Sequence, residues 1–339
     1  MATKHRLIKY IRKIAFSNFL DTCISILIIG VFILCSLLIG KWLLYDAEWK
    51  VVIDNLPLYT FGLYPEDQRW RPALWMIYLI VLVLLTLFGH RFRRVRKLMP
   101  FAWMFAIPLG IILLSGGIGL VPVSSRYWGG LTLTILLMSC SAFLAFPMGI
   151  VLAICRQSDL PIIKYLSSIY IDAFRAIPLI AILFFGQLLI PLFLPSGLEI
   201  NRVLRAIIAY ALFVAAYVAE DIRGGLQSIP LSQIEAAKSI GLSKFQINRH
   251  IILPQALVIA LPALSNQVIG LLQNTSLMAI LGLVELLGIS RSLLANPEFI
   301  GRYVEVYVWV AAIYWLVCTL MALLSRHLEK RMSFGKTNL

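Results

Sequence analysis

The chain carries, in a polar break between two long apolar stretches, Glu235-Ala236-Ala237, then Gly241, then Ile251-Ile252-Leu253-Pro254. Three residues separate the first block from the glycine, and nine separate the glycine from the last block. Apolar runs of about 20 residues are long enough to cross a bilayer as helices. The polar break is therefore expected to join two membrane helices at one face of the membrane.

Composition places the whole chain in a membrane. Of the 339 residues, 60% are hydrophobic and only 14% are charged, which is more apolar sequence than a soluble core absorbs. The lipid bilayer is thus the expected surrounding partner. The net charge of +14 would suggest nucleic acid on a soluble domain, but here it fits basic cytoplasmic loops, and no nucleic acid partner is expected. None of the five cysteines lies in an expected external loop, so we expect neither a disulfide nor a metal site.

Eight stretches are long and apolar enough to cross the membrane. They are residues 19–44, 72–89, 100–122, 128–154, 174–194, 203–220, 256–283 and 303–325. The polar breaks between them alternate in charge. Segments 1–13, 90–97, 155–175, 221–253 and 326–339 contain 21 of the 30 Lys and Arg residues. Because basic residues retain loops in the cytoplasm, both termini and the break at 221–253 are predicted to be cytoplasmic.

The predicted organisation has two membrane parts and a tail. Residues 1–123 form a three-helix N-terminal extension with an external loop at 45–71, rich in Trp, Pro and acidic residues. Residues 124–330 form five helices around the cytoplasmic loop 221–253, and residues 331–339 form a cytoplasmic tail. The predicted fold class is an all-α polytopic membrane protein of about eight transmembrane helices.

Local chemistry predicts a first short helix in the polar break. Ser232 and Glu235 have the Ser-x-x-Glu spacing of a capping box. The helix then runs through Ala236 and Ala237 and is expected to stop at Gly241, which suits a C-terminal cap. Glu235 and Gly241 also have purely local interpretations, as a cap and a turn. The small residues at 236 and 237 favour a functional one, because they let a partner surface approach closely.

A second short helix should follow at once. Ser243 and Gln246 repeat the capping-box spacing, and Pro254 suits the first turn of the next membrane helix, where its missing N–H is not needed. The break is therefore predicted to be a helix–turn–helix on the membrane surface. Its apolar side would consist of Ile234, Ala237, Ile240, Leu242, Phe245 and Ile251.

The Glu-Ala-Ala…Gly…Ile-x-Leu-Pro spacing resembles the cytoplasmic coupling loop of ABC importer membrane subunits. From about 119 to 290 the chain is similar to permeases of polar amino acid importers. The resembling stretches are Arg175-Ala176-Ile177-Pro178-Leu179, residues 215–230, Ile252–Leu257 and Asn274–Leu277. The three additional N-terminal helices and residues 156–161 resemble the longer, M-type permease of broad-specificity L-amino acid systems. Ala176 replaces a common Gly and Asn274 a common acidic residue; the latter could alter substrate preference.

The resemblance implies a five-helix type I importer permease core and a set of partners. These are an ABC ATPase dimer that docks on the coupling loops, a second permease in a heterodimer, and a periplasmic amino acid-binding protein. The implied ATPase-coupling residues are Glu235, Ala236, Ala237, Gly241, Leu253 and Pro254. The implied location is the bacterial inner membrane. ATP and Mg would be bound by the partner ATPase, so this chain is expected to be no enzyme and to bind no cofactor.

The span 256–283 is polar at its middle, which suggests a solute pathway. Asn266, Gly270, Gln273 and Asn274 follow helical spacing and share one face, and Thr275 follows directly. This face could line the amino acid path, or it could hydrogen-bond to neighbouring helices, a common use of membrane Asn and Gln.

A zwitterionic solute would also need charges or helix-end dipoles. The nearest charged candidates in the membrane are Arg175 and Glu220, which could equally be interfacial or structurally paired.

Other functional classes fit less well. An ion-coupled secondary transporter of small polar solutes is the alternative, but it needs ionisable groups near the bilayer centre and leaves the coupling-loop pattern unexplained. A membrane enzyme should carry clustered acidic or His residues at one face, and the four His residues are scattered. A purely structural scaffold would not need the polar stripe of 256–283.

Overall fold

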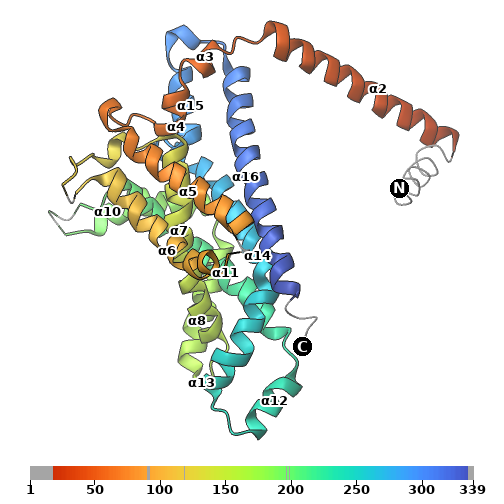
Figure 1. The fold of residues 1–339 in the computed structure, drawn as a ribbon, viewed down its shortest axis with the longest axis vertical. Helices are drawn as coiled ribbons and strands as arrows, with labels where there is room; N and C mark the ends of the chain where they lie inside the picture. Colours follow the sequence, from red (N-terminus) through yellow and green to blue (C-terminus); the bar gives the residue numbers. More distant parts are fainter. Residues whose placement is uncertain (1–17, 90–91, 118, 196, 198, 335–339) are drawn as a thin grey trace. The chain divides into compact units, whose positions relative to one another are not determined.

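The computed structural model describes residues 18–334 apart from 90–91, 118, 196 and 198 (Figure 1). The basic start at 1–13 and positions 335–339 of the expected tail lie outside the described residues. The chain divides into two compact units, Met1–Ile53 and Asp54–Leu339.

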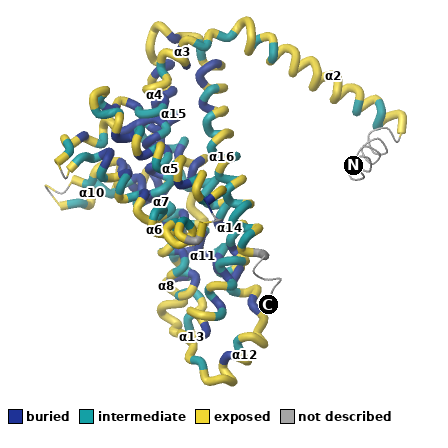
Figure 2. The backbone as a smooth tube through the Cα atoms, viewed as in Figure 1, coloured by how far each residue is buried: buried dark blue, intermediate teal, exposed yellow. Residues whose placement is uncertain are grey.

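The first unit is dominated by one apolar helix. Helix α2 spans Phe19–Lys41 and continues as a π-helical turn, Trp42–Asp46, and a short helix α3 covers Lys50–Ile53. None of the α2 side chains is buried, as Figure 2 shows along its length. A helix that is apolar on all sides and unburied is suited to contact with lipid.

In the second unit, α4 (Leu56–Phe61) precedes two packed helices, α5 (Trp70–Phe88) and α6 (Arg93–Ser115). The Trp75 indole, fully buried, donates to the carbonyl of Ala106 at 2.8 Å. The Tyr78 hydroxyl donates to the carbonyl of Ala102 at 2.9 Å. These bonds satisfy the polar ends of aromatic side chains inside an apolar pair of helices, which holds α5 and α6 in register.

Helices α7 (Gly130–Arg156), α11 (Arg202–Gln227) and α14 (Leu253–Asn274) form the centre of this unit. Small residues permit their close approach. A Cβ atom at Gly149 of α7 would lie 2.4 Å from Cγ1 of Val218, and one at Gly225 of α11 would lie 2.4 Å from the carbonyl oxygen of Ala256. Such contacts are typical of membrane helices, where packing rather than water exclusion drives association.

The segment between α7 and α11 is a broken helix rather than the single span expected at 174–194. Helix α8 covers Pro161–Ala176, and α9 (Leu179–Phe184), a π-turn (Phe185–Leu189) and α10 (Ile190–Phe193) continue after a bend of 104°. The bend falls at Ile177 and Pro178, both in extended conformations. Proline removes a helical N–H and disfavours a helical residue before it, which explains the break.

The C-terminal part contains η7 (Thr275–Leu281), α15 (Leu286–Leu294), η8 (Pro297–Phe299) and the long α16 (Tyr303–Phe334). Within the described residues, seven helices could cross a membrane, or eight if the bent pair is one span. The predicted all-α polytopic class is confirmed. Several helices run beyond the expected spans, such as α11 to Gln227, because a helix continues through the polar headgroup region.

Candidate functional site

The polar break forms two helical pieces around a glycine turn at one end of the unit, below α11 in Figure 1. Helix α12 spans Leu231–Ser239, and Gly241 follows it with φ +83°. The N–H of Gly241 donates to the carbonyl of Lys238 at 3.0 Å, and the N–H of Leu242 donates to the carbonyl of Ala237 at 3.2 Å. This pair of bonds is the Schellman motif, so the prediction that Gly241 caps the helix is confirmed.

One of the two expected capping boxes forms and the other does not. Ser243 and Gln246 make the reciprocal bonds of a capping box at the start of α13 (Lys244–Ile247). The box predicted for Ser232 and Glu235 is wrong, because Pro230 occupies the cap position and no side chain caps α12. The helix begins at Leu231, one residue before Ser232. Ser232 therefore lies inside the helix and does not cap it.

The second piece is not a separate surface helix as expected. Helix α13, a π-helical turn (Asn248–Ile252) and α14 follow one another without a break, and together with η7 they form one span from Lys244 to Leu281. Pro254 lies in the first turn of α14, where it was predicted to lie. The turn at Gly241 therefore connects directly to a membrane helix.

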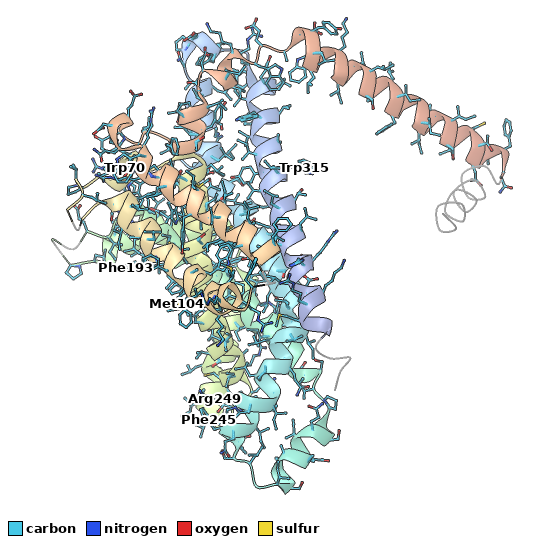
Figure 3. The ribbon with its side chains drawn as sticks, viewed as in Figure 1. Trp70, Met104, Phe193, Phe245, Arg249 and Trp315 are labelled. Carbon is cyan, nitrogen blue, oxygen red and sulfur yellow. The ribbon has the colours of Figure 1, made fainter. Side chains whose placement is uncertain are left out.

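The loop has its own small core, which fixes the direction of the Glu-Ala-Ala residues. Ala237 is buried with Ile229, Ile247 and Ile252. By contrast, Glu235 and Ala236 are exposed. Exposed apolar side chains lie beside them, namely Leu231, Ile240 and Phe245. Two members of the predicted apolar side, Ile240 and Phe245, therefore lie outside the buried core of the loop. Figure 3 shows Phe245 close to Arg249, whose guanidinium lies 6.0 Å from the ring centre.

A hollow of about 550 Å³ lies between the loop and the end of α7. Asp159, in the turn after α7, forms an ion pair with Lys244 at the start of α13. The ammonium group of Lys244 lowers the pKa of the Asp159 carboxyl. The pair links the 157–160 turn to the second piece of the loop.

Charged side chains of α7, α8 and α11 meet around Glu220. Its carboxylate lies 3.4 Å from Arg156 and 3.5 Å from Arg175, and Nε of Arg223 donates to it at 2.9 Å. Arg156 also pairs with Asp172 at 3.1 Å. The structure thus brings Arg175 and Glu220 together as part of an interhelical network. This network ties three helices together near the loop.

The polar face of α14 is open in this chain. Asn266, Gln273 and Asn274 are exposed, and a Cβ atom at Gly270 would meet nothing within 4 Å. Thr275 is different: it is buried and its hydroxyl donates to the carbonyl of Leu272 at 2.6 Å. Among the described residues, no hydrogen bond or ion pair joins these positions to Arg175 or Glu220. The role of the α14 face in a pathway stays a prediction.

Sequence reasoning missed a buried carboxylate at the far end of the unit. Glu285 caps α15, accepting from the backbone N–H groups of Leu287 and Gly288 at 2.9 and 2.8 Å. The Tyr314 hydroxyl donates to it at 3.2 Å, and Thr134 lies at 3.5 Å. Burial raises the pKa of the Glu285 carboxyl to about 7. The sequence carries one signal for this residue: Glu285 directly precedes a new apolar run, which is the position of a helix N-cap.

Membrane-crossing helices joined through an exposed, capped loop define a multi-pass α-helical membrane subunit. Residues 145–334 match the family described as binding-protein-dependent transport system inner membrane component, and the chain belongs to this family.

The similar curated relatives include the inner membrane amino-acid ABC transporter permease protein YhdY of Escherichia coli (strain K12). It is 38% identical over 296 residues, covering 86% of this chain and 79% of the relative. The glutamate/glutamine/aspartate/asparagine transport system permease protein BztC of Rhodobacter capsulatus is 34% identical, covering 84% of this chain and 79% of the relative.

Solved structures agree on the fold. A crystal structure of an amino acid ABC transporter with histidines matches with 31% identity and a TM-score of 0.54, over 60% of this chain and 92% of that chain. An inward-facing MetNI methionine ABC transporter matches with 21% identity and a TM-score of 0.50, over 60% of this chain and 94% of that chain. This second likeness concerns the fold alone. The predicted permease core is therefore confirmed.

Proposed function

We propose that this chain is the permease subunit of an ATP-driven, binding-protein-dependent importer of L-amino acids. The observation that carries the proposal is the family membership over residues 145–334, together with relatives whose names specify amino acid transport. The chain forms half of the translocation pathway in the inner membrane, with both termini in the cytoplasm.

Coupling to a separate ATPase runs through the loop around Gly241. The exposed Glu235 and Ala236, flanked by exposed Leu231 and Ile240, offer a mixed polar and apolar surface to a partner. The Schellman cap and the small core around Ala237 hold that surface rigid. Because α13 continues into α14, a push on the loop is transmitted to a membrane helix. ATP and Mg are held by the ATPase dimer, and this chain binds neither.

The pathway lies along the open face of α14 that carries Asn266, Gln273 and Asn274. Gln273 already donates to Sγ of Cys318 at 3.9 Å. An exposed amide such as that of Asn266 is costly in the bilayer unless a partner or a solute satisfies it. A second, different permease facing this surface would complete the path, in a heterodimer. A binding protein on the external side delivers the amino acid.

The test uses the complex purified in nanodiscs or proteoliposomes with its ATPase and binding protein. Glu235→Lys should leave the chain inserted but reduce ATP-driven amino acid uptake by about tenfold or more, because it reverses a charge at the docked surface. Gly241→Asp should do the same, because it places a negative charge at the C-terminal end of α12, where the helix dipole disfavours it. Glu298→Lys reverses an exposed carboxylate in η8, at the other end of the unit, and should retain the ATPase on purification of the complex as the unchanged protein does. Normal uptake in both loop variants would refute the coupling role.

An ion-coupled secondary transporter is not favoured, because the similar relatives are named as ABC permeases. Uptake that persisted without ATPase and responded to an ion gradient would reverse this conclusion.

A further inference from the structure

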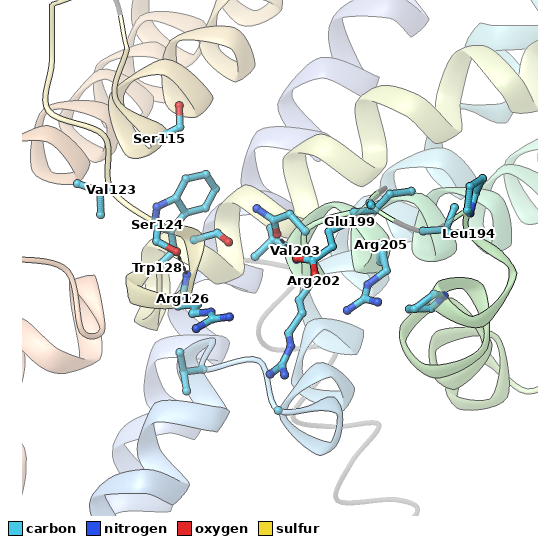
Figure 4. Close-up of a pocket in the computed structure, with 18 residues that line it drawn as sticks. Ser115, Val123, Ser124, Arg126, Trp128, Leu194, Glu199, Arg202, Val203 and Arg205 are labelled. Atoms are coloured by element: carbon cyan, nitrogen blue, oxygen red, sulfur yellow. Dashed lines mark hydrogen bonds between the residues drawn. The ribbon is translucent and has the colours of Figure 1, made fainter.

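A second hollow, of about 1050 Å³, lies at the end of the unit opposite the coupling loop. It is bordered by the end of α6, by the 123–128 segment before α7, by residues of α10 and of the segment that joins it to α11, by the start of α11 and by the turn after η7. Its charged lining consists of Arg126, Arg202, Arg205 and a single carboxylate, Glu199. Figure 4 shows the three arginine side chains extending to the same side of the ribbon.

Arg202 and Arg205 lie where a positive charge is electrostatically unfavourable. Arg202 is the first residue of α11 and Arg205 lies in its first turn, while no acidic residue occupies that turn. The N-terminus of a helix carries a partial positive charge, which favours anions and disfavours cations. The cap itself, a bond from the N–H of Val203 to the Asn201 side chain at 2.7 Å, does not offset the two charges. A helix start of this kind is suited to an external anion.

The three arginines also have no carboxylate partner in the part of the chain that the structure describes. Among the residues that the structure describes, none of them forms an ion pair, and Nε of Arg205 is buried without a hydrogen-bond partner. The arginines of the opposite end behave differently: Arg156 and Arg175 both pair with Glu220. The accessible guanidinium nitrogens that line the hollow can therefore form charge-assisted hydrogen bonds with carboxylates supplied from outside.

The membrane orientation makes these charges more unusual. The basic residues of this chain gather in the segments predicted to be cytoplasmic. The breaks that alternate with those segments lie on the opposite side, so 124–127 and 195–205 are predicted to be external. Basic residues are depleted on that side of membrane proteins. Membrane topology therefore does not explain why three arginines surround one external hollow.

We propose that this arginine-lined hollow is the surface on which an acidic patch of the extracytoplasmic binding protein docks. The inference rests on the proposed function. A protein partner fits better than a free amino acid, because small-ligand pockets of about 300–1,000 Å³ are mostly apolar with a few converging polar groups. Here the cationic groups come from two separate elements and lie around an open space at the upper end of that range. Charged rims of this kind steer association and fix the register of a complex.

The experiment measures binding-protein-stimulated ATPase activity of the complete complex in nanodiscs, as a function of binding-protein concentration and of salt. The variants are Arg202→Gln, Arg205→Gln and their double substitution. Each single change should raise the half-saturating concentration by about two- to fivefold, with a weaker salt dependence in the double variant. Arg291→Gln, an exposed arginine in α15 that does not line the hollow, is the matched control and should bind as the unchanged protein does.

The outcomes separate the competing explanations. Unaltered affinity and salt dependence in the double variant, with the unchanged protein responding normally, would overturn the docking site while leaving the proposed function intact. An altered KM for the amino acid with an unaltered response to binding protein would assign the hollow to the solute and equally overturn docking. No stimulation of the unchanged complex by binding protein would overturn both proposals. Thermal stability distinguishes misfolding, because removing a cation from the start of α11 should not lower it.

Discussion

Gly241→Ala tests whether the capped turn keeps the coupling loop rigid. The glycine has φ +83°, a conformation that costs an L-residue roughly 1–2 kcal/mol. A Cβ atom at this position would meet nothing within 4 Å, so the cost is backbone strain alone and no side-chain clash contributes. The substitution should therefore open the two cap hydrogen bonds, from Gly241 to Lys238 and from Leu242 to Ala237, about five to thirty times more often.

Hydrogen–deuterium exchange of the complex in nanodiscs, followed for the peptide containing residues 237–242, measures this opening directly. ATP-driven uptake should fall alongside the faster exchange. Gly241→Asn should be milder, because asparagine tolerates the left-handed conformation better than alanine. Gly224→Ala is the control: its φ is ordinary and its surroundings are open, so alanine in the helix should be neutral or slightly stabilising. Equal exchange in the Gly241 and Gly224 alanine variants would refute the reasoning.

Three further predictions concern stability. Gly149→Ala should lower the free energy of unfolding by about 1–3 kcal/mol through its clash with Val218, as judged by thermal unfolding in detergent. Val218→Ala should restore only part of it in the double variant, because it removes Cγ1 at 2.4 Å but leaves Cβ at 2.7 Å. Glu220→Gln should lower thermal stability more than Asp172→Asn does, because the Glu220 side chain is 21% exposed with three arginine partners and the Asp172 side chain is 59% exposed; equal effects would contradict the network. Burial raises the pKa of the Glu285 carboxyl from 4.5 to about 7, so its protonated form stabilises the folded protein. This contribution to the free energy of unfolding, on the order of 3 kcal/mol, is present below pH 4.5 and is lost as the pH rises to about 7. Unfolding midpoints measured from pH 5 to 8 should show this decline in the unchanged protein and lose it in Glu285→Gln; parallel pH curves would contradict the assignment.

The sequence by itself determined the membrane class, the approximate spans and the turn at Gly241. Apolar runs of the length needed to cross a bilayer have no other stable environment, so composition alone settles the class. The Gly241 cap and the Ser243–Gln246 box depend on residues within a few positions of one another. Such local hydrogen bonds are readable from spacing.

Tertiary structure decided what depends on distant partners. Which apolar side chains of the loop are buried was settled by the packing around Ala237, which leaves Ile240 and Phe245 exposed. Glu285 gained its partners from Thr134 and Tyr314, which are far from it in the chain. The grouping of Arg126 with Arg202 and Arg205 around one hollow likewise required the helix ends to meet. Burial and charge neighbours are properties of the packed helices, and no short-range pattern encodes them.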